Sequence, residues 1–206
     1  MLRLGLTGGI ACGKTTATQM LSQKGALILD ADLLAREVVR PGQPAWAGIV
    51  NWLGEEILLA DGSLDRSKIA ARVFQDESAR QRLNALIHPR VRTLFLTQSK
   101  KLSQNHPQKI QVWDVPLLFE AGMEKLVDYV VVVASREEKQ IMRLLVRNGL
   151  AREEALRRIN AQMDLWKKVM AADFVLANDN TRKSLQMQVD QLWEKLQQLW
   201  ENRQHP

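Results

Sequence analysis

A glycine-rich segment near the amino terminus has the composition and spacing of a phosphate-binding loop. The segment Gly8-Gly9-Ile10-Ala11-Cys12-Gly13-Lys14-Thr15 fits the pattern G-x-x-x-x-G-K-[ST]. Glycines allow backbone N–H groups to curl closely around a phosphate, where side chains would block the approach. Lys14 can reach β- and γ-phosphate oxygens, and the hydroxyl of Thr15 can bind Mg²⁺. The segment therefore predicts binding of a nucleoside triphosphate.

Carboxylates follow two other apolar segments that are typical of strands. Asp30 and Asp32 come directly after the apolar run 26–29, and Asp114 ends the run 109–114. Ligands of open α/β sheets bind at the carboxyl ends of the strands. We interpret Asp30 mainly as a cap of the following helix and Asp32 as a functional group. Asp114 is at the position where a carboxylate can hold Mg²⁺ through water.

A third group of candidate residues is basic. Residues 136–168 contain nine basic and five acidic side chains, so +4 of the net charge of +6 comes from this segment. Arg143 and Arg147 are four residues apart, on one face of a predicted helix that stops at Gly149. A hairpin of two helices with arginines on both, after a strand, is the layout of a lid that excludes water and places cations against developing charge.

The elements that must position these residues alternate between strands and helices. We predict an α/β fold with a parallel five-stranded sheet in a three-layer core, since the apolar runs are short and are separated by helical patterns. The predicted strands cover residues 2–8, 26–29, 109–114, 128–133 and 174–177. Ser135 with Glu138 predicts a capping box at the start of the lid. A long C-terminal helix, with an apolar stripe that includes Leu185 and Leu196, should cover the sheet.

Residues 41–108 have no strand pattern, and we predict a helical insertion that binds substrate. Asp65 and Asp76 can cap two of its helices, one of which carries Phe74 near its end. His88-Pro89 is expected to interrupt a helix, because the residue before a proline avoids the α region. The predicted division is thus a nucleotide-binding core (1–40, 109–135 and 169–206), the insertion (41–108) and the lid (136–168).

Composition limits the classes of protein that this chain can belong to. It has 206 residues, 46% of them apolar, and no apolar run near the ~20 residues needed to span a bilayer. One cysteine excludes an internal disulfide and fits a reducing compartment. The first strand begins at once, so we expect no targeting peptide and a cytoplasmic protein.

Several motifs, taken together and in this order, resemble the dephospho-coenzyme A kinase family. They are Thr7-Gly8-Gly9-Ile10 with Gly13-Lys14, Asp30-Ala31-Asp32 with Arg36, His88-Pro89, Asp114-Val115-Pro116-Leu117-Leu118-Phe119-Glu120, and Ala172-Asp173 with Val175 and Asn178. The loop alone marks a superfamily, whereas the combination at these spacings is far more specific.

This resemblance implies transfer of the ATP γ-phosphate to the ribose 3′-hydroxyl of dephospho-coenzyme A, the last step of coenzyme A synthesis. It implies ATP and dephospho-coenzyme A as partners, with Mg²⁺ as the cofactor on Thr15 and Asp114. Catalysis is assigned to Asp32 as general base, with Lys14 and Arg143. Nucleotide contacts are assigned to Gly8, Gly9, Ile10, Ala11, Cys12, Gly13, Lys14, Thr15, Thr16, Arg147 and Asn178. Acceptor contacts are assigned to Thr7, Asp32, Arg36, His88, Pro116, Leu117 and Glu120.

The chain departs from the family pattern at three places. Ala11-Cys12 replaces the usual Gly-Ser, and Cys12 near a helix start and a lysine is expected to favour thiolate, so that its alkylation would block activity. Ala151 stands where a Ser or Thr would cap the second lid helix, which should loosen that helix. The loop Asn178-Asp179-Asn180, expected near the adenine, lacks the glycine that is common at the end of this loop in the family.

Three alternative functions remain to be compared with this one. Another small-molecule or nucleoside monophosphate kinase would share the loop and lid but would not need the helical insertion. A GTPase-type switch requires an Asn-Lys-x-Asp motif, and the sequence has none. Nucleic-acid binding could use the basic charge (pI ≈ 9.7), but a polyanionic substrate explains basic residues gathered in a lid more simply. We therefore expect no nucleic-acid or membrane partner, and a monomer or weak homo-oligomer.

Overall fold

The structure, a computed structural model, describes residues 1–73 and 76–204. Phe74, expected in a helix of the insertion, lies outside the described residues. The chain divides into two compact units. The first consists of Met1–Leu29 with Leu102–Pro206, and the second of Asp30–Lys101.

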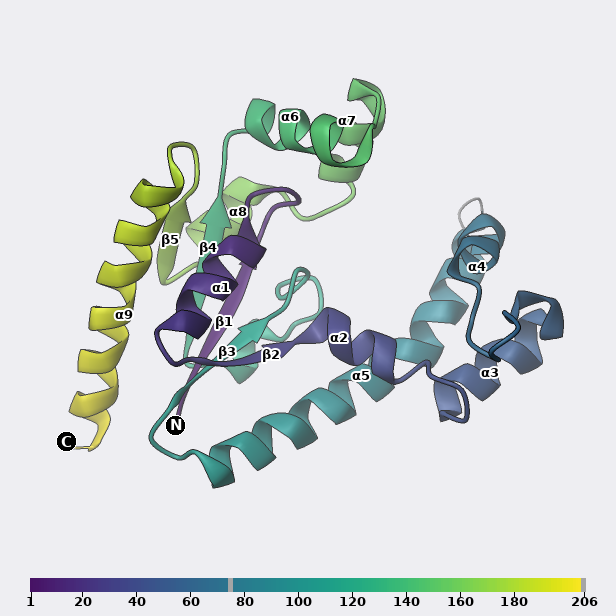
Figure 1. The fold of residues 1–206 in the computed structure, drawn as a ribbon, viewed down its shortest axis with the longest axis horizontal. Helices are drawn as coiled ribbons and strands as arrows, with labels where there is room; N and C mark the ends of the chain where they lie inside the picture. Colours follow the sequence, from purple (N-terminus) through teal and green to yellow (C-terminus); the bar gives the residue numbers. More distant parts are fainter. Residues whose placement is uncertain (74–75, 205–206) are drawn as a thin grey trace. The chain divides into compact units, whose positions relative to one another are not determined.

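A five-stranded sheet has the order β2-β3-β1-β4-β5 (Figure 1). The strands are β1 (Leu2–Gly8), β2 (Leu27–Asp30), β3 (Ile110–Asp114), β4 (Tyr129–Ala134) and β5 (Phe174–Ala177). β1 pairs in parallel with both β3 and β4, and β4 pairs in parallel with β5. The predicted parallel α/β sheet is confirmed, and every predicted strand lies within one residue of an observed strand. Since β1 is central, the loop that follows it lies beside the ends of β3 and β4.

Apolar side chains on one face of the sheet form the core of the first unit. Leu2, Leu4 and Leu6 are fully buried in one cluster with residues of α1 (Lys14–Gln23) and α9 (Arg182–Gln204). Figure 1 shows α1 and α9 side by side along the sheet. The long C-terminal helix thus covers the sheet as predicted. The opposite face of β1 holds Gly5, where a Cβ would lie 2.8 Å from a methyl of Leu118, so glycine allows the segment after β3 to pack closely.

The remaining helices of the first unit follow β3 and β4. A short 3₁₀ helix, η2 (Glu124–Leu126), precedes β4. After β4 come α6 (Glu137–Asn148), α7 (Arg152–Asn160) and α8 (Leu165–Met170). The helices α6 and α7 form a hairpin beyond the carboxyl end of the sheet (Figure 1), which we call the lid hairpin. Gly149, in the left-handed conformation, ends α6 as predicted.

The predicted capping box at the start of α6 is wrong. The N-cap residue is Arg136, and its side chain makes no capping hydrogen bond. Instead, Asp179 Oδ1 accepts hydrogen bonds from the Arg136 amide at 2.8 Å and from the Ser135 hydroxyl at 2.9 Å. The Ser135 hydroxyl is therefore a donor to Asp179 and does not cap α6. Asp179, in the loop between β5 and α9, takes the capping role that was predicted for Ser135. At the start of α7, Ala151 provides no side-chain cap, as predicted.

The second unit is helical, as the sequence predicts. Its helices are α2 (Ala31–Glu37), α3 (Pro44–Leu53), η1 (Glu55–Ile57), α4 (Arg66–Val73) and the larger part of α5 (Glu77–Asn105). Asp30, Asp65 and Asp76 each accept a hydrogen bond from the backbone amide two residues later, which confirms them as caps.

The predicted interruption at His88-Pro89 is wrong, because α5 continues through Pro89. Proline has no N–H to donate to the preceding turn and disfavours α geometry in the residue before it. In the same turn Arg90 Nη1 donates to the carbonyl of Leu86 at 2.6 Å, which adds a side-chain hydrogen bond beside the missing one. Leu86 and Ile87 also pack against the core of the second unit. The packing of Leu86 and Ile87 before the proline, with the buried Phe95 after it, therefore outweighs the local preference of Pro89.

Candidate active site

The glycines of residues 8–15, which we call the phosphate loop, are required by their neighbours. A Cβ on Gly8 would collide with the carbonyl oxygen of Val133 in β4. Gly13 has φ +94°, and a Cβ there would collide with the side-chain amide of Asn178. Ala11 has φ 58° and is the non-glycine residue with positive φ among the described residues. The left-handed conformation favours glycine. Glycine is also the residue expected in place of Ala11 from the family that the sequence resembles.

Lys14, at the start of α1, pairs with the carboxylate that ends β3. Its ammonium contacts Asp114 Oδ1, and the hydroxyl of Thr18 donates to Asp114 Oδ2 at 2.6 Å. The Asp114 side chain is only 5% exposed, so this carboxylate is held in place. Sequence analysis missed Thr18, although its position one turn after Lys14 could have indicated it. Thr15 is exposed.

Metal binding at this site would depend on few protein ligands. The described residues contain no group of three or more His, Cys, Asp or Glu side chains that could hold a metal ion. Thr15 and Asp114 offer one hydroxyl and one carboxylate. Such a pair fits Mg²⁺, which is usually bound through one or two carboxylates, substrate phosphates and water.

Arg143 and Asn178 hold the backbone of the phosphate loop from two directions. Arg143, in α6, donates to the carbonyl of Ala11 at 3.0 Å and to that of Asn178 at 2.7 Å. The side-chain amide of Asn178 donates to the carbonyl of Cys12 at 2.8 Å. The structure thus brings these two predicted residues together with the loop. Arg147 is exposed and donates to Asn148 at 2.9 Å, away from this cluster.

The loop after β5 is tied to the start of the lid hairpin through Asp179. Burial acts to raise the pKa of this carboxyl, but hydrogen bonds from the Arg136 amide and the Ser135 hydroxyl, with the nearby charges of Arg136 and Lys139, hold that pKa below its usual value. Lys139 also donates its ammonium to the backbone carbonyl of Asp179. The residues expected near the adenine therefore form an ordered junction between α6 and β5.

The expectation of a thiolate at Cys12 is wrong. Cys12 is fully buried within the core cluster of the sheet. Burial raises the pKa of its thiol to about 11, and this effect outweighs hydrogen bonds from the backbone and the charge of Arg143. The thiol therefore stays protonated and buried at neutral pH, so the reactivity on which the predicted effect of alkylation depends has no structural basis.

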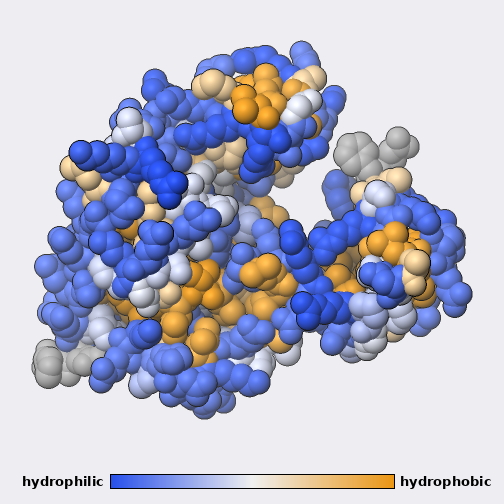
Figure 2. Space-filling model, in the orientation of Figure 1, coloured by the Kyte–Doolittle hydropathy of each residue, from blue (hydrophilic) through white to orange (hydrophobic). Residues whose placement is uncertain are grey.

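The lid hairpin shares a small apolar core with the phosphate loop. Its buried residues Ile141, Leu144 and Ala155 are packed against Ile10 and Ala11. On the other side of the hairpin, Met142 and Val146 are exposed on α6, and Figure 2 shows apolar surface over this hairpin. The loop and the lid are thus joined by packing as well as by hydrogen bonds.

A hydrogen bond from beyond α7 also fixes the phosphate loop. The Ile10 amide donates to Gln162 Oε1 at 3.1 Å. Gln162 belongs to no motif of the sequence, so sequence analysis missed it. Its partner is a backbone amide, and no local pattern in the sequence identifies such a contact.

Residues 115–123, which we call the acceptor loop, contain three predicted substrate contacts. The Thr7 hydroxyl donates to the carbonyl of Pro116 at 2.9 Å, and Leu117 is exposed. Glu120 Oε1 accepts a hydrogen bond from the Met163 amide at 3.0 Å. The same oxygen lies 2.7 Å from Lys168 Nζ, at ion-pair distance but outside hydrogen-bond geometry. Lys168 is fully buried, so this pairing places a counter-charge beside a desolvated ammonium.

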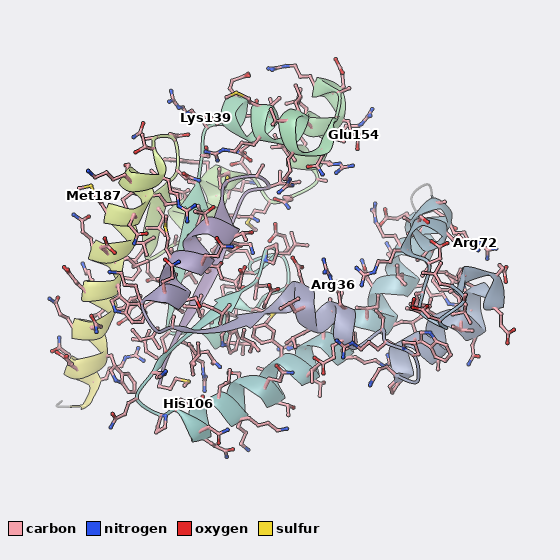
Figure 3. All side chains as sticks on the ribbon, viewed as in Figure 1. Arg36, Arg72, His106, Lys139, Glu154 and Met187 are labelled. Carbon is pink, nitrogen blue, oxygen red and sulfur yellow. The ribbon has the colours of Figure 1, made fainter. Side chains whose placement is uncertain are left out.

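The second unit contains a cavity of about 460 Å³ with charged groups in its wall. Asp32, Arg36 and Arg66 line it, together with apolar residues that include Val39 and Ile69. Figure 3 shows Arg36 projecting from α2. The structure thus places the two predicted residues Asp32 and Arg36 on one cavity. Arg66, at the first position of α4, is a candidate that sequence analysis missed, because nothing in the local pattern distinguishes it from a solvated arginine.

His88 is the remaining predicted acceptor residue. It is exposed within α5 and does not line this cavity.

Together the parallel sheet, the phosphate loop after its central strand and the arginine-bearing lid hairpin define a P-loop kinase of small molecules. The family model described as Dephospho-CoA kinase matches residues 2–184. The chain belongs to the dephospho-CoA kinase family.

Individual relatives agree with this family. A Dephospho-CoA kinase of Listeria monocytogenes is 42% identical over 186 residues, which cover 90% of this chain and 92% of the relative. One from Anaeromyxobacter dehalogenans is 45% identical over 190 residues, covering 92% and 89%. Among solved structures, TT1252 from Thermus thermophilus is 32% identical, with a TM-score of 0.78 and coverage of 95% and 97%. Within the described residues, no helix combines the length and apolar character needed to cross a membrane.

Proposed function

We propose that this chain transfers the γ-phosphoryl group of ATP to the ribose 3′-hydroxyl of dephospho-coenzyme A, with Asp32 as the general base. The products are coenzyme A and ADP. The main support for this activity is the match to the family over almost the whole chain. The place of Asp32 on a cavity with two arginines supports its role toward a phosphorylated acceptor. In this step the Asp32 carboxylate accepts the hydroxyl proton, the 3′-oxygen bonds to the γ-phosphorus, and the bond to the ADP oxygen breaks.

The phosphate donor is proposed to bind at residues 8–16, with Lys14 and Arg143 neutralising charge on the transferring group. Binding of ATP offers Lys14 phosphate oxygens in place of Asp114. Mg²⁺ on Thr15 and Asp114 would supply positive charge to the phosphates. Asn178 and Arg147 complete the proposed nucleotide contacts. The bonds of Arg143 and Asn178 to loop carbonyls support roles in holding the loop in shape.

The acceptor is proposed to bind to residues 41–108, with Arg36 from α2 and with His88, Pro116, Leu117 and Glu120. A wall that is mainly apolar but carries Arg36 and Arg66 suits this molecule, which combines a long uncharged arm with a diphosphate. Residues 136–168 serve as the lid, and residues 1–40, 109–135 and 169–206 as the nucleotide-binding core. The expected setting is the cytoplasm, for a monomer or weak homo-oligomer.

The role of Asp32 is tested by Asp32→Asn. The amide cannot accept the proton as a carboxylate does, so we expect kcat to fall by about 100-fold or more. The dissociation constant of ATP should remain nearly unchanged. Asp61→Asn, in an exposed turn of the same unit, is the matched control and should keep wild-type turnover. Weak ATP binding by Asp32→Asn would instead assign Asp32 a metal-binding or structural role.

A further inference from the structure

Two adjacent residues after α7 bind two different loops of the first unit. Gln162 accepts a hydrogen bond from the Ile10 amide of the phosphate loop at 3.1 Å. Met163 donates its amide to Glu120 of the acceptor loop at 3.0 Å. The two loops are more than a hundred residues apart in the sequence, yet consecutive residues of one short segment hold both.

Each end of this connection is tied to its surroundings. At one end, Ile10 also packs against the apolar core of the lid hairpin, so a shift of the phosphate loop is transmitted to that core. The backbone N–H of Gln162 donates to the carbonyl of Ile159 at 3.2 Å, which ties this residue to the end of α7. At the other end, the fully buried Lys168 keeps Glu120 in place, because removal of the carboxylate would leave an unpaired ammonium in the interior.

We propose that Gln162, Glu120 and Lys168 are positioning residues that couple the nucleotide site to the acceptor site. A displacement of the acceptor loop on binding its substrate moves the carboxylate of Glu120, hence Met163 and Gln162, and so changes the geometry of the phosphate loop at Ile10. None of the three needs to touch the reacting atoms for this role. The proposal rests on the proposed assignment of the two loops to ATP and to dephospho-coenzyme A.

The test measures how each ligand changes the affinity for the other. Titration calorimetry gives the dissociation constant of a non-hydrolysable ATP analogue alone and with saturating dephospho-coenzyme A, and the ratio of the two is the coupling factor. For the wild type we expect this factor to differ from 1 by about fivefold or more. In Gln162→Leu, which removes the acceptor at similar volume, it should return to within about twofold of 1. Lys168→Met, which frees Glu120, should act in the same direction.

Gln186→Leu is the matched control, because Gln186 bonds Asp190 one turn later in α9 and should keep the wild-type factor. Thermal unfolding, followed by circular dichroism, checks that each variant is folded. If Lys168→Met does not fold, the coupling factor of Gln162→Leu alone tests the proposal. A coupling factor of 1 in the wild-type protein would overturn the proposal. So would a coupling factor in Gln162→Leu equal to that of the wild type, even if this variant has a lowered melting temperature. Failure of the wild type to bind dephospho-coenzyme A would instead contradict the proposed function.

Discussion

At the scale of single residues, Arg66 offers a direct test of the cavity in the second unit. Within the part of the chain that the structure describes, its side chain makes no hydrogen bond or ion pair, and it lines the cavity with Asp32 and Arg36. Loss of a charged hydrogen bond to the acceptor diphosphate should raise the KM for dephospho-coenzyme A by about tenfold or more in Arg66→Ala. The KM for ATP should not change.

The matched control for this prediction is Arg80→Ala. Arg80 is in the same unit and pairs with Glu77 on the surface of α5, away from the cavity. Steady-state kinetics with each substrate varied in turn separates the two KM values. Equal effects of the two substitutions would contradict the assignment of Arg66 to the acceptor.

The buried thiol of Cys12 predicts a pH dependence of stability. Its pKa rises from 9.0 to about 11 on folding. Folding therefore favours the protonated thiol, so this contribution is complete below pH 9 and is lost as the pH rises towards 11. By linkage the loss is at most about 3 kcal/mol. Urea unfolding at pH 8 and pH 10.5 should show a smaller decrease in unfolding free energy for Cys12→Ala than for the wild type. An equal decrease would place the thiol in contact with water.

At this scale the sequence predicts a conformation well where the residue type alone limits the backbone. Gly8 and Gly13 belong to a local pattern whose close approaches are observed. The prediction for Cys12 was wrong because burial in the core raises the pKa of its thiol more than a helix start and a nearby lysine can lower it. Gln162 and Lys168 could not be identified, since their partners are brought to them only by the tertiary fold.

At the scale of elements, α6 depends on a cap from a distant part of the chain. Asp179 accepts hydrogen bonds from the Arg136 amide and the Ser135 hydroxyl. We expect Asp179→Ala to lower the free energy of unfolding by about 1–2 kcal/mol, the usual cost of a lost cap. The exposed neighbour Asn180 provides the control, and Asn180→Ala should leave the free energy of unfolding nearly unchanged. A urea titration of each variant measures the difference, and equal stabilities would show that Asp179 contributes no cap.

The order and type of the elements could be predicted because strands and helices have distinct apolar periodicities. The two errors have a common physical cause. At Ser135 and at His88-Pro89, local preferences were read correctly but were outweighed, by the carboxylate of Asp179 in one case and by packing around α5 in the other. Caps formed within a few residues, such as those of Asp30, Asp65 and Asp76, were predicted, since both partners lie in the same stretch of sequence.

At the scale of the whole molecule, two compact units divide the proposed tasks. The first carries the phosphate loop, the lid hairpin and the acceptor loop, and the second carries the cavity with Asp32, Arg36 and Arg66. The cluster of basic residues in 136–168 agrees with a polyanionic substrate, although Lys168 and Arg143 are engaged by protein groups rather than free. Charge counts in a sequence therefore indicate the class of substrate better than they identify the residues that bind it.

The most direct test of this account is ADP release from ATP and Mg²⁺, with dephospho-coenzyme A, AMP, adenosine and shikimate supplied separately. The position of the new phosphate in the product is then determined by nuclear magnetic resonance. We expect turnover with dephospho-coenzyme A only, and a product phosphorylated at the ribose 3′-position. Turnover with AMP or shikimate but not with dephospho-coenzyme A would retain the P-loop kinase fold but contradict the proposed acceptor and the roles of Arg36, His88 and the acceptor loop.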